Sequence, residues 1–135
     1  MSGETDLDRL LAGMRPVLDP ETYVFVTTPA PPGTPALMRF EEEEGTTLIL
    51  TRAAAEAAGL PHEFPCRRIT LTVHSALEAV GFIARVATRL AAEGMGVNPV
   101  AGFHHDHLFV PADRAADAMA ALHAMAAEAG ATLRP

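Results

Sequence analysis

Apolar positions in the first thirty residues recur first with helical and then with strand spacing. Between residues 5 and 15, leucine and methionine side chains return every three or four positions, which predicts a short amphipathic helix. Thr5 followed by Asp8 is typical of a helix start, and Pro16 is expected to end the helix. Residues 22–28 are rich in β-branched and aromatic side chains and therefore predict a strand.

A proline-rich loop separates this strand from a predicted hairpin. Residues 36–42 and 46–51 have strand patterns, and the four consecutive glutamates at 41–44 indicate a solvated turn rather than a metal site, because neighbouring strand residues point to opposite faces. An alanine-rich helix over 52–58 follows, closed by Gly59 as its C-cap.

The second half of the chain begins after a proline-bracketed segment at 61–65, which we interpret as a linker. Residues 67–74 alternate apolar and polar side chains and predict a half-buried strand. Ser75 followed by Glu78 is typical of a capping box at a helix start. The expected buried stripe of that helix is Val80, Ile83, Ala84, Ala87 and Leu90.

The last part of the chain predicts a hairpin and a long helix. Strand patterns over 97–103 and 107–110 flank a turn, and a helix then runs from Pro111 to about residue 129, where Gly130 is expected to end it. Residues 131–134 are consistent with a short edge strand or a frayed end. The expected inner face of the last helix is Ala116, Met119, Leu122, His123 and Ala126.

The order of these elements predicts an α+β fold. Strands that alternate with helices and include hairpins favour antiparallel sheets with helices on one face, as in two ferredoxin-like modules. We expect an irregular N-terminal module over 1–63 and a more regular C-terminal module over 64–135. Modules of about 65 residues are close to the lower size limit for an independent core, so they are expected to share an interface, and a dimer is expected.

Composition excludes several classes of protein. The 135-residue chain has a formal net charge of −7 and no lysine, and its aromatic content is 5%, which is unsuited to nucleic-acid binding. The sequence contains neither an apolar run long enough to span a membrane nor a signal-peptide pattern, so a cytoplasmic protein without membrane contact is expected. Cys66 is expected to be a buried thiol.

Two segments of the second half resemble a known family. Residues 69–81 (ITLTVHSALEAVG) and 102–111 (GFHHDHLFVP), with the looser match of 18–26, resemble small bacterial ACT-domain proteins of uncharacterised function. Those proteins are similar to the regulatory modules of aspartokinase and to the cytosolic arginine sensor. The resemblance implies tandem βαββαβ modules. It also implies an amino acid or other small ligand bound between modules, beside the loop that joins the first strand to the first helix. In this chain that loop is 73–81.

The chemistry of this loop agrees with that expectation. A helix N-terminus offers free N–H groups to an α-carboxylate, Glu78 is suited to an α-ammonium group, and Gly81 permits close approach. The alternative is that Ser75 and Glu78 only cap each other's backbone groups, and that Asn98 is only a turn or strand-edge residue. The candidate ligand-binding residues are His74, Ser75, Leu77, Glu78, Val80, Gly81 and Asn98.

A histidine cluster suggests a metal site, but its spacing argues against one. His104, His105 and His107 carry suitable donor atoms, yet consecutive residues in a tight turn diverge. A polar turn, or a pH-responsive or ligand-lining role, are the alternatives. His123 is expected to be a hydrogen-bonded histidine in the core or at an interface. We therefore assign no metal and no cofactor.

The sequence contains no recognisable catalytic set. His74 and Ser75 are adjacent at a strand end and diverge, and there is neither a serine elbow nor a glycine-rich phosphate loop. We therefore predict a non-catalytic protein that binds an amino acid or another small molecule and acts as a regulatory sensor. The alternatives are a ligand-free oligomerisation module and a histidine-based metal protein.

Overall fold

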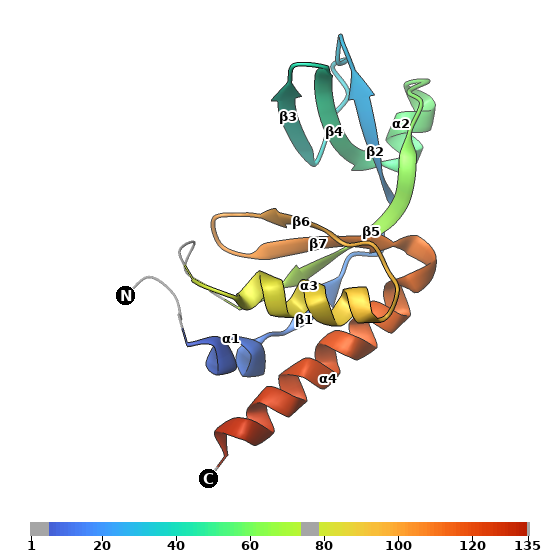
Figure 1. Cartoon of the computed structure of the whole chain (residues 1–135). Helices are drawn as coiled ribbons and strands as arrows, with labels where there is room; N and C mark the ends of the chain where they lie inside the picture. The colour runs from blue at the N-terminus through green and yellow to red at the C-terminus, as the bar shows by residue number, and fades with distance from the viewer. Residues whose placement is uncertain (1–5, 74–78, 135) are drawn as a thin grey trace.

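A computed structural model of the chain describes residues 6–73 and 79–134 (Figure 1). In these residues seven strands form one sheet in the order β3-β4-β2-β5-β7-β6, with β1 beside β5, and all pairs are antiparallel. The elements are α1 (Leu7–Gly13), β1 (Pro16–Leu18), β2 (Tyr23–Thr28), β3 (Met38–Glu42), β4 (Gly45–Thr51), α2 (Arg52–Ala57), β5 (Glu63–Leu71), α3 (Phe82–Ala92), β6 (Asn98–Ala101), β7 (Asp106–Pro111), a 3₁₀ turn (Ala112–Arg114) and α4 (Ala115–Leu133).

Strand β5 connects the two halves of this curled sheet. Its first residues pair with β2, where Tyr23 lies opposite Cys66, and its last three residues pair with β1, where Leu18 lies opposite Ile69. The β3-β4-β2 half and the β1-β5-β7-β6 half therefore bend away from each other along one strand (Figure 1). The expected antiparallel α+β fold with two ferredoxin-like units is confirmed.

Helices cover one face of each half. Helix α2 packs on β2 and β4 through Ala55, while α1, α3 and α4 cover the other half (Figure 1). Leu10 and Leu11 of α1 are buried in the same cluster as Ile69 and Leu71 of β5 and as the inner residues of α3 and α4. Thus α1 and β1 pack with the second half of the chain, although they belong to the first half in sequence. The division at residue 63 remains a prediction.

Helix α3 begins later than its sequence pattern predicts. Its first residue is Phe82, and Gly81 precedes it with φ of 90°, so Val80 is not part of the helix as predicted. The predicted capping box of Ser75 and Glu78 lies outside the described residues. Leu90 of the predicted stripe is fully buried, but the other buried residues of the helix are Phe82 and Val86, and Val80 is 84% exposed. The left-handed backbone at Gly81 is the physical reason, since it interrupts any helical path from the preceding loop.

Helix α4 is longer than predicted and, apart from Leu122, buries a different set of residues. It continues through Gly130 to Leu133, so neither the stop at Gly130 nor an edge strand over 131–134 occurs. His123 is exposed in the chain, which corrects its assignment to the inner face. The helix is rich in alanine on all sides, and its apolar pattern therefore does not determine which stripe faces the core. The buried residues are Ala115, Ala118, Ala121, Leu122, Met125 and Ala129.

Three smaller differences concern the ends of strands and helices. Residues 63–65 belong to β5 rather than to a linker, and β1 was not predicted. Helix α1 is capped by Asp6, whose carboxylate accepts a hydrogen bond from the Arg9 N–H group. The β3–β4 and β6–β7 hairpins and helix α2 lie where the sequence predicts them.

The β6–β7 turn allows a prediction about Gly102. A Cβ atom at this residue would lie 2.9 Å from the carbonyl oxygen of His105, which itself accepts a hydrogen bond from the Gly102 N–H group. Backbone must therefore move, and Gly102→Ala is expected to lower the free energy of unfolding by about 1–3 kcal/mol. Urea denaturation measures this change. Gly96→Ala is the control, because nothing lies within 4 Å of its added Cβ, and an equal loss there would contradict the prediction.

Candidate functional site

Most of the ligand-binding residues predicted from the sequence lie outside the described part of the chain. His74, Ser75, Leu77 and Glu78 belong to this group. Of the remaining loop residues, Val80 is exposed, and a Cβ on Gly81 would lie 3.7 Å from Cδ2 of Leu7 in α1. This end of the loop therefore lies between the N-terminus of α3 and the first turn of α1.

Asn98 lies on another part of the sheet. It is the first residue of β6 and pairs with Phe109 of β7, on the face of the sheet that the helices leave uncovered. Residues of α3 pack on the opposite face, against Ile69 and Leu71. The structure therefore separates Asn98 from Gly81 by the thickness of the sheet.

The histidine cluster spreads around the β6–β7 turn. His104 is exposed beside Phe103, and its ring centroid is 6.4 Å from that of His105. His107 turns to β5, where its Nδ1 shares a hydrogen bond of 2.9 Å with the Thr70 hydroxyl group. Within the described residues, no group of three histidine, cysteine, aspartate or glutamate side chains could hold a metal ion.

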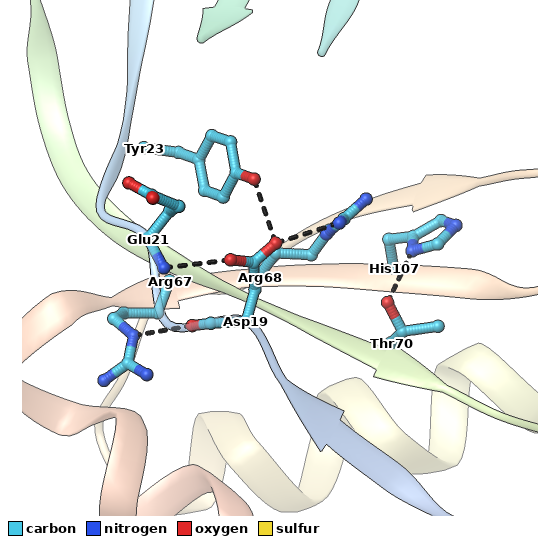
Figure 2. A network of polar contacts seen from close by, with 7 residues as sticks. All are labelled: Asp19, Glu21, Tyr23, Arg67, Arg68, Thr70 and His107. Atoms are coloured by element: carbon cyan, nitrogen blue, oxygen red, sulfur yellow. Dashed lines mark hydrogen bonds and ion pairs between the residues drawn. The ribbon is translucent and has the colours of Figure 1, made fainter. Parts of the chain in front are cut away.

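A polar network that sequence reasoning missed joins the two halves of the sheet (Figure 2). The carboxylate of Asp19, in the turn between β1 and β2, accepts hydrogen bonds of 2.9 Å from the Glu21 N–H group, the Tyr23 hydroxyl and Nη2 of Arg68. Nε of Arg67 donates to the Asp19 carbonyl oxygen, also at 2.9 Å. Burial alone would raise the pKa of Asp19, but these hydrogen bonds and the Arg68 charge lower it below its usual value.

The Arg68 guanidinium lies between Asp19 and His107 (Figure 2). Its carbon atom is 5.9 Å from the centroid of the Tyr23 ring, and its Nε is buried without a hydrogen-bond partner among the described residues. Burial lowers the pKa of His107, and the positive charge of Arg68 lowers it further. His107 is therefore mainly neutral at pH 7.

A cleft opens on this helix-free face, between the two halves of the sheet. It has a volume of about 130 Å³ and is lined by Leu37, Met38, Arg68, Val100, His107 and Phe109. Its floor belongs to a cluster in which Phe25 and Phe109 make an edge-to-face contact with centroids 6.0 Å apart. On β5, the polar residue Arg68 alternates with the buried residue Ile69. From the sequence, this alternation predicts only that one face of the strand is polar and the other is buried.

A larger groove lies on the helical side of the molecule. It has a volume of about 430 Å³ and runs between α1, α3 and α4, where Arg89 and Glu128 make a bidentate ion pair with two contacts of 3.0 Å. Both partners of this pair are substantially exposed to water, so the ion pair contributes little to stability.

Cys66 has no features of a nucleophile. Its side chain is fully buried, and its thiol donates a hydrogen bond of 3.3 Å to the carbonyl oxygen of Tyr23. Burial raises the pKa of this thiol to about 12, so it stays protonated at physiological pH. The predicted buried thiol is confirmed. In the described residues, no helix is long and apolar enough to cross a membrane.

Comparisons with known proteins identify the two halves. Residues 2–67 and 63–124 each match an ACT-domain family, and the matches overlap at the start of β5, the strand that both halves share. No curated protein sequence matches the chain significantly.

Solved structures extend this result to the whole chain. A Vibrio cholerae protein of unknown function, called a possible transport protein, is 41% identical over 89% of this chain and 95% of its own, with a TM-score of 0.82. An Agrobacterium tumefaciens protein is 14% identical over 84% and 89%, with a TM-score of 0.72. The ligand-free regulatory subunit of aspartate kinase from Thermus thermophilus shares the fold, with 13% identity over 82% and 95% and a TM-score of 0.61. The chain belongs to the ACT-domain family and contains two ACT domains in tandem.

Proposed function

We propose that this protein is a non-catalytic sensor that binds an amino acid between ACT domains. ACT domains are regulatory modules for small molecules, and the observation that carries the proposal is the tandem match over residues 2–124. The Asp19 carboxylate is engaged in hydrogen bonds that join strands, and the Cys66 thiol is buried with its pKa raised to about 12. This arrangement supports binding rather than catalysis.

The proposed site is the 73–81 loop and the N-terminus of α3. Helix α3 has eleven residues, and among the described residues no side chain caps its first amide groups, which in this proposal bind the α-carboxylate. Gly81 allows close approach, and the exposed Val80 offers apolar contact. Glu78 supplies the negative charge for the α-ammonium group in this proposal.

Thermal denaturation in the presence of each of the twenty amino acids tests the proposed function. A ligand that binds only the folded state stabilises it in proportion to the logarithm of its concentration over Kd. We expect one amino acid, or a small related group, to raise the Tm at millimolar concentration. If none of the twenty changes the Tm, the amino-acid proposal is wrong.

The role of Glu78 is tested separately once that amino acid is known. Glu78→Ala is expected to weaken its binding by about 1.5–3 kcal/mol, because a charge-assisted hydrogen bond to the α-ammonium group is lost. Isothermal titration calorimetry measures the change in Kd. Glu44→Ala is the control, since Glu44 lies in the exposed turn between β3 and β4. Equal affinities of the two variants would remove Glu78 from the site.

A second proposed property is self-association into a dimer, which large exposed apolar side chains favour. Phe40 is 64% exposed and Phe103 is 74% exposed, and both lie in hairpins. Replacement of both by serine is expected to lower the sedimentation coefficient, measured by sedimentation velocity, towards that of the monomer. An unchanged sedimentation coefficient would exclude these residues from the interface. If the wild type associates but no amino acid changes its Tm, the ligand-free oligomerisation module becomes the better description.

A further inference from the structure

We propose that the cleft between the two halves of the sheet is a second binding site, for a short branched-chain monocarboxylate without an ammonium group. The cleft opens on the helix-free face, whereas helix α3, which follows the proposed amino-acid loop, packs on the other face. The described residues that line the cleft come from the segment before β3, from β3 itself and from β5, β6 and β7. A ligand there would contact both ACT domains at once.

The volume and lining of the cleft determine the size and polarity of the ligand. About 130 Å³ is well above the roughly 10–15 Å³ that one water molecule needs and below the size of most sites for larger cofactors. Leu37, Met38, Val100 and Phe109 make most of the wall apolar. A branched aliphatic chain of a few carbon atoms suits these surroundings.

Arg68 selects the charge of the ligand. A guanidinium has five N–H donors, and the hydrogen bond that the structure gives to its side chain is the one from Nη2 to Asp19. Figure 2 shows that one end of the guanidinium is turned away from Asp19, and Nε is buried without a partner. Buried donors are normally satisfied, so this arginine is suited to donate hydrogen bonds to a carboxylate.

The same surroundings disfavour an α-ammonium group. In the described part of the chain, none of the side chains that line the cleft is acidic. The nearest carboxylate of the network, Asp19, already accepts three hydrogen bonds and has its charge balanced by Arg68. An ammonium group placed beside Arg68 would be repelled and would have no anionic partner, so a simple carboxylate is preferred over the corresponding amino acid.

Three probes of similar shape test this inference: isovalerate, its neutral amide isovaleramide, and leucine. Each is titrated into ¹⁵N-labelled protein, and backbone chemical shifts are followed. Isovalerate is expected to cause saturable shifts at residues 66–70, 98–101 and 106–110, with a Kd at least tenfold lower than that of isovaleramide or of leucine at the same residues. No saturable shift with isovalerate, or equal affinity for the amide, would overturn the inference.

Two variants locate the binding site. Arg68→Met is expected to raise the Kd for isovalerate at least tenfold, whereas Arg67→Met should leave it within twofold, because Arg67 points to the other side of β5 and bonds to the Asp19 carbonyl oxygen (Figure 2). Val100→Phe fills the cleft while keeping the side chains that form the Asp19 network, and it should abolish binding even if Arg68→Met fails to fold. Wild-type affinity in Val100→Phe would refute the site.

The outcome is independent of the proposed amino-acid sensor. An amino acid bound at the 73–81 loop would shift the amide signals of residues 79–84 and would respond to Glu78→Ala. A carboxylate in the cleft would respond to Arg68→Met and Val100→Phe. Failure of either set of measurements therefore leaves the other proposal standing.

Discussion

Replacing Leu10 with alanine is expected to lower the free energy of unfolding by about 2–5 kcal/mol, although this leucine lies near the N-terminus in a helix of only seven residues. Leu10 is fully buried among residues of β5, α3 and α4. The alanine leaves a cavity at the point where α1 meets α4, and α1 and α4 are in extensive contact. Chemical denaturation measures the loss.

Hydrogen exchange shows which part of the molecule the change affects. Because α1 packs with the second half of the chain, Leu10→Ala should reduce protection of amides in β7 and α4 more than in β4. Val24→Ala is the matched control, since Val24 is equally buried but belongs to the cluster of β2, β4 and α2. It should reduce protection in β4 most. If Leu10→Ala instead reduces amide protection in β4 and leaves it unchanged in β7 and α4, then α1 stabilises the first half of the sheet rather than the second.

Strong local patterns were sufficient to predict several elements. The β3–β4 hairpin has strand patterns on both sides of a glutamate-rich turn, and the alanine-rich segment 52–58 contains helix α2. Residues close together in the sequence determine these features, so the spacing of apolar side chains and the capping residues are enough to predict them. The ACT resemblance rested on residues 69–81 and 102–111, and the matches to both halves confirm it.

Elements that depend on distant partners could not be predicted in this way. Strand β1 has three residues, and its partner in β5 lies about fifty positions later in the chain, so its local pattern is too short to indicate a strand. The prediction of which side of α4 is buried failed for another reason. Alanines on every side of this helix make several stripes equally apolar. In both cases tertiary packing decides what the local sequence leaves open.

The cleft illustrates the same limit for a candidate site. Arg68 and His107 are separated by 39 positions in sequence, yet Arg68 lies opposite Phe109 and Thr70 opposite His107 across the β5–β7 pair. In the sequence, His107 was grouped only with its neighbours in the turn, and Asp19 was part of the 18–26 match but was not a candidate site residue. The register of β5 against β7 brings these residues together. Which residues of two strands lie opposite each other cannot be read from one sequence.

Asp19 is the second residue at which a large effect is expected. Asp19→Ala should lower the free energy of unfolding by about 2–4 kcal/mol, because it removes hydrogen bonds from Tyr23 and Arg68 and leaves the arginine charge partly buried without its partner. Denaturation at pH 7 measures the effect. Glu21→Ala is the control, since Glu21 takes part in the network through its backbone N–H group, which the substitution keeps. An equal loss in both variants would show that the Asp19 side chain is unimportant.

The pH dependence of this loss follows from the pKa of Asp19. Hydrogen bonds and the Arg68 charge lower the pKa in the folded protein below the usual 3.8, so the unfolded chain binds a proton at a higher pH than the folded chain. The stabilisation from Asp19 is therefore complete above the unfolded pKa and is lost as the pH falls through the folded value. The difference in stability between wild type and Asp19→Asn should be constant from pH 5 to 7 and should shrink below about pH 4. A difference that stays constant down to pH 2 would mean that the charge of Asp19 contributes nothing, and that Tyr23 and Arg68 are held in place by packing alone.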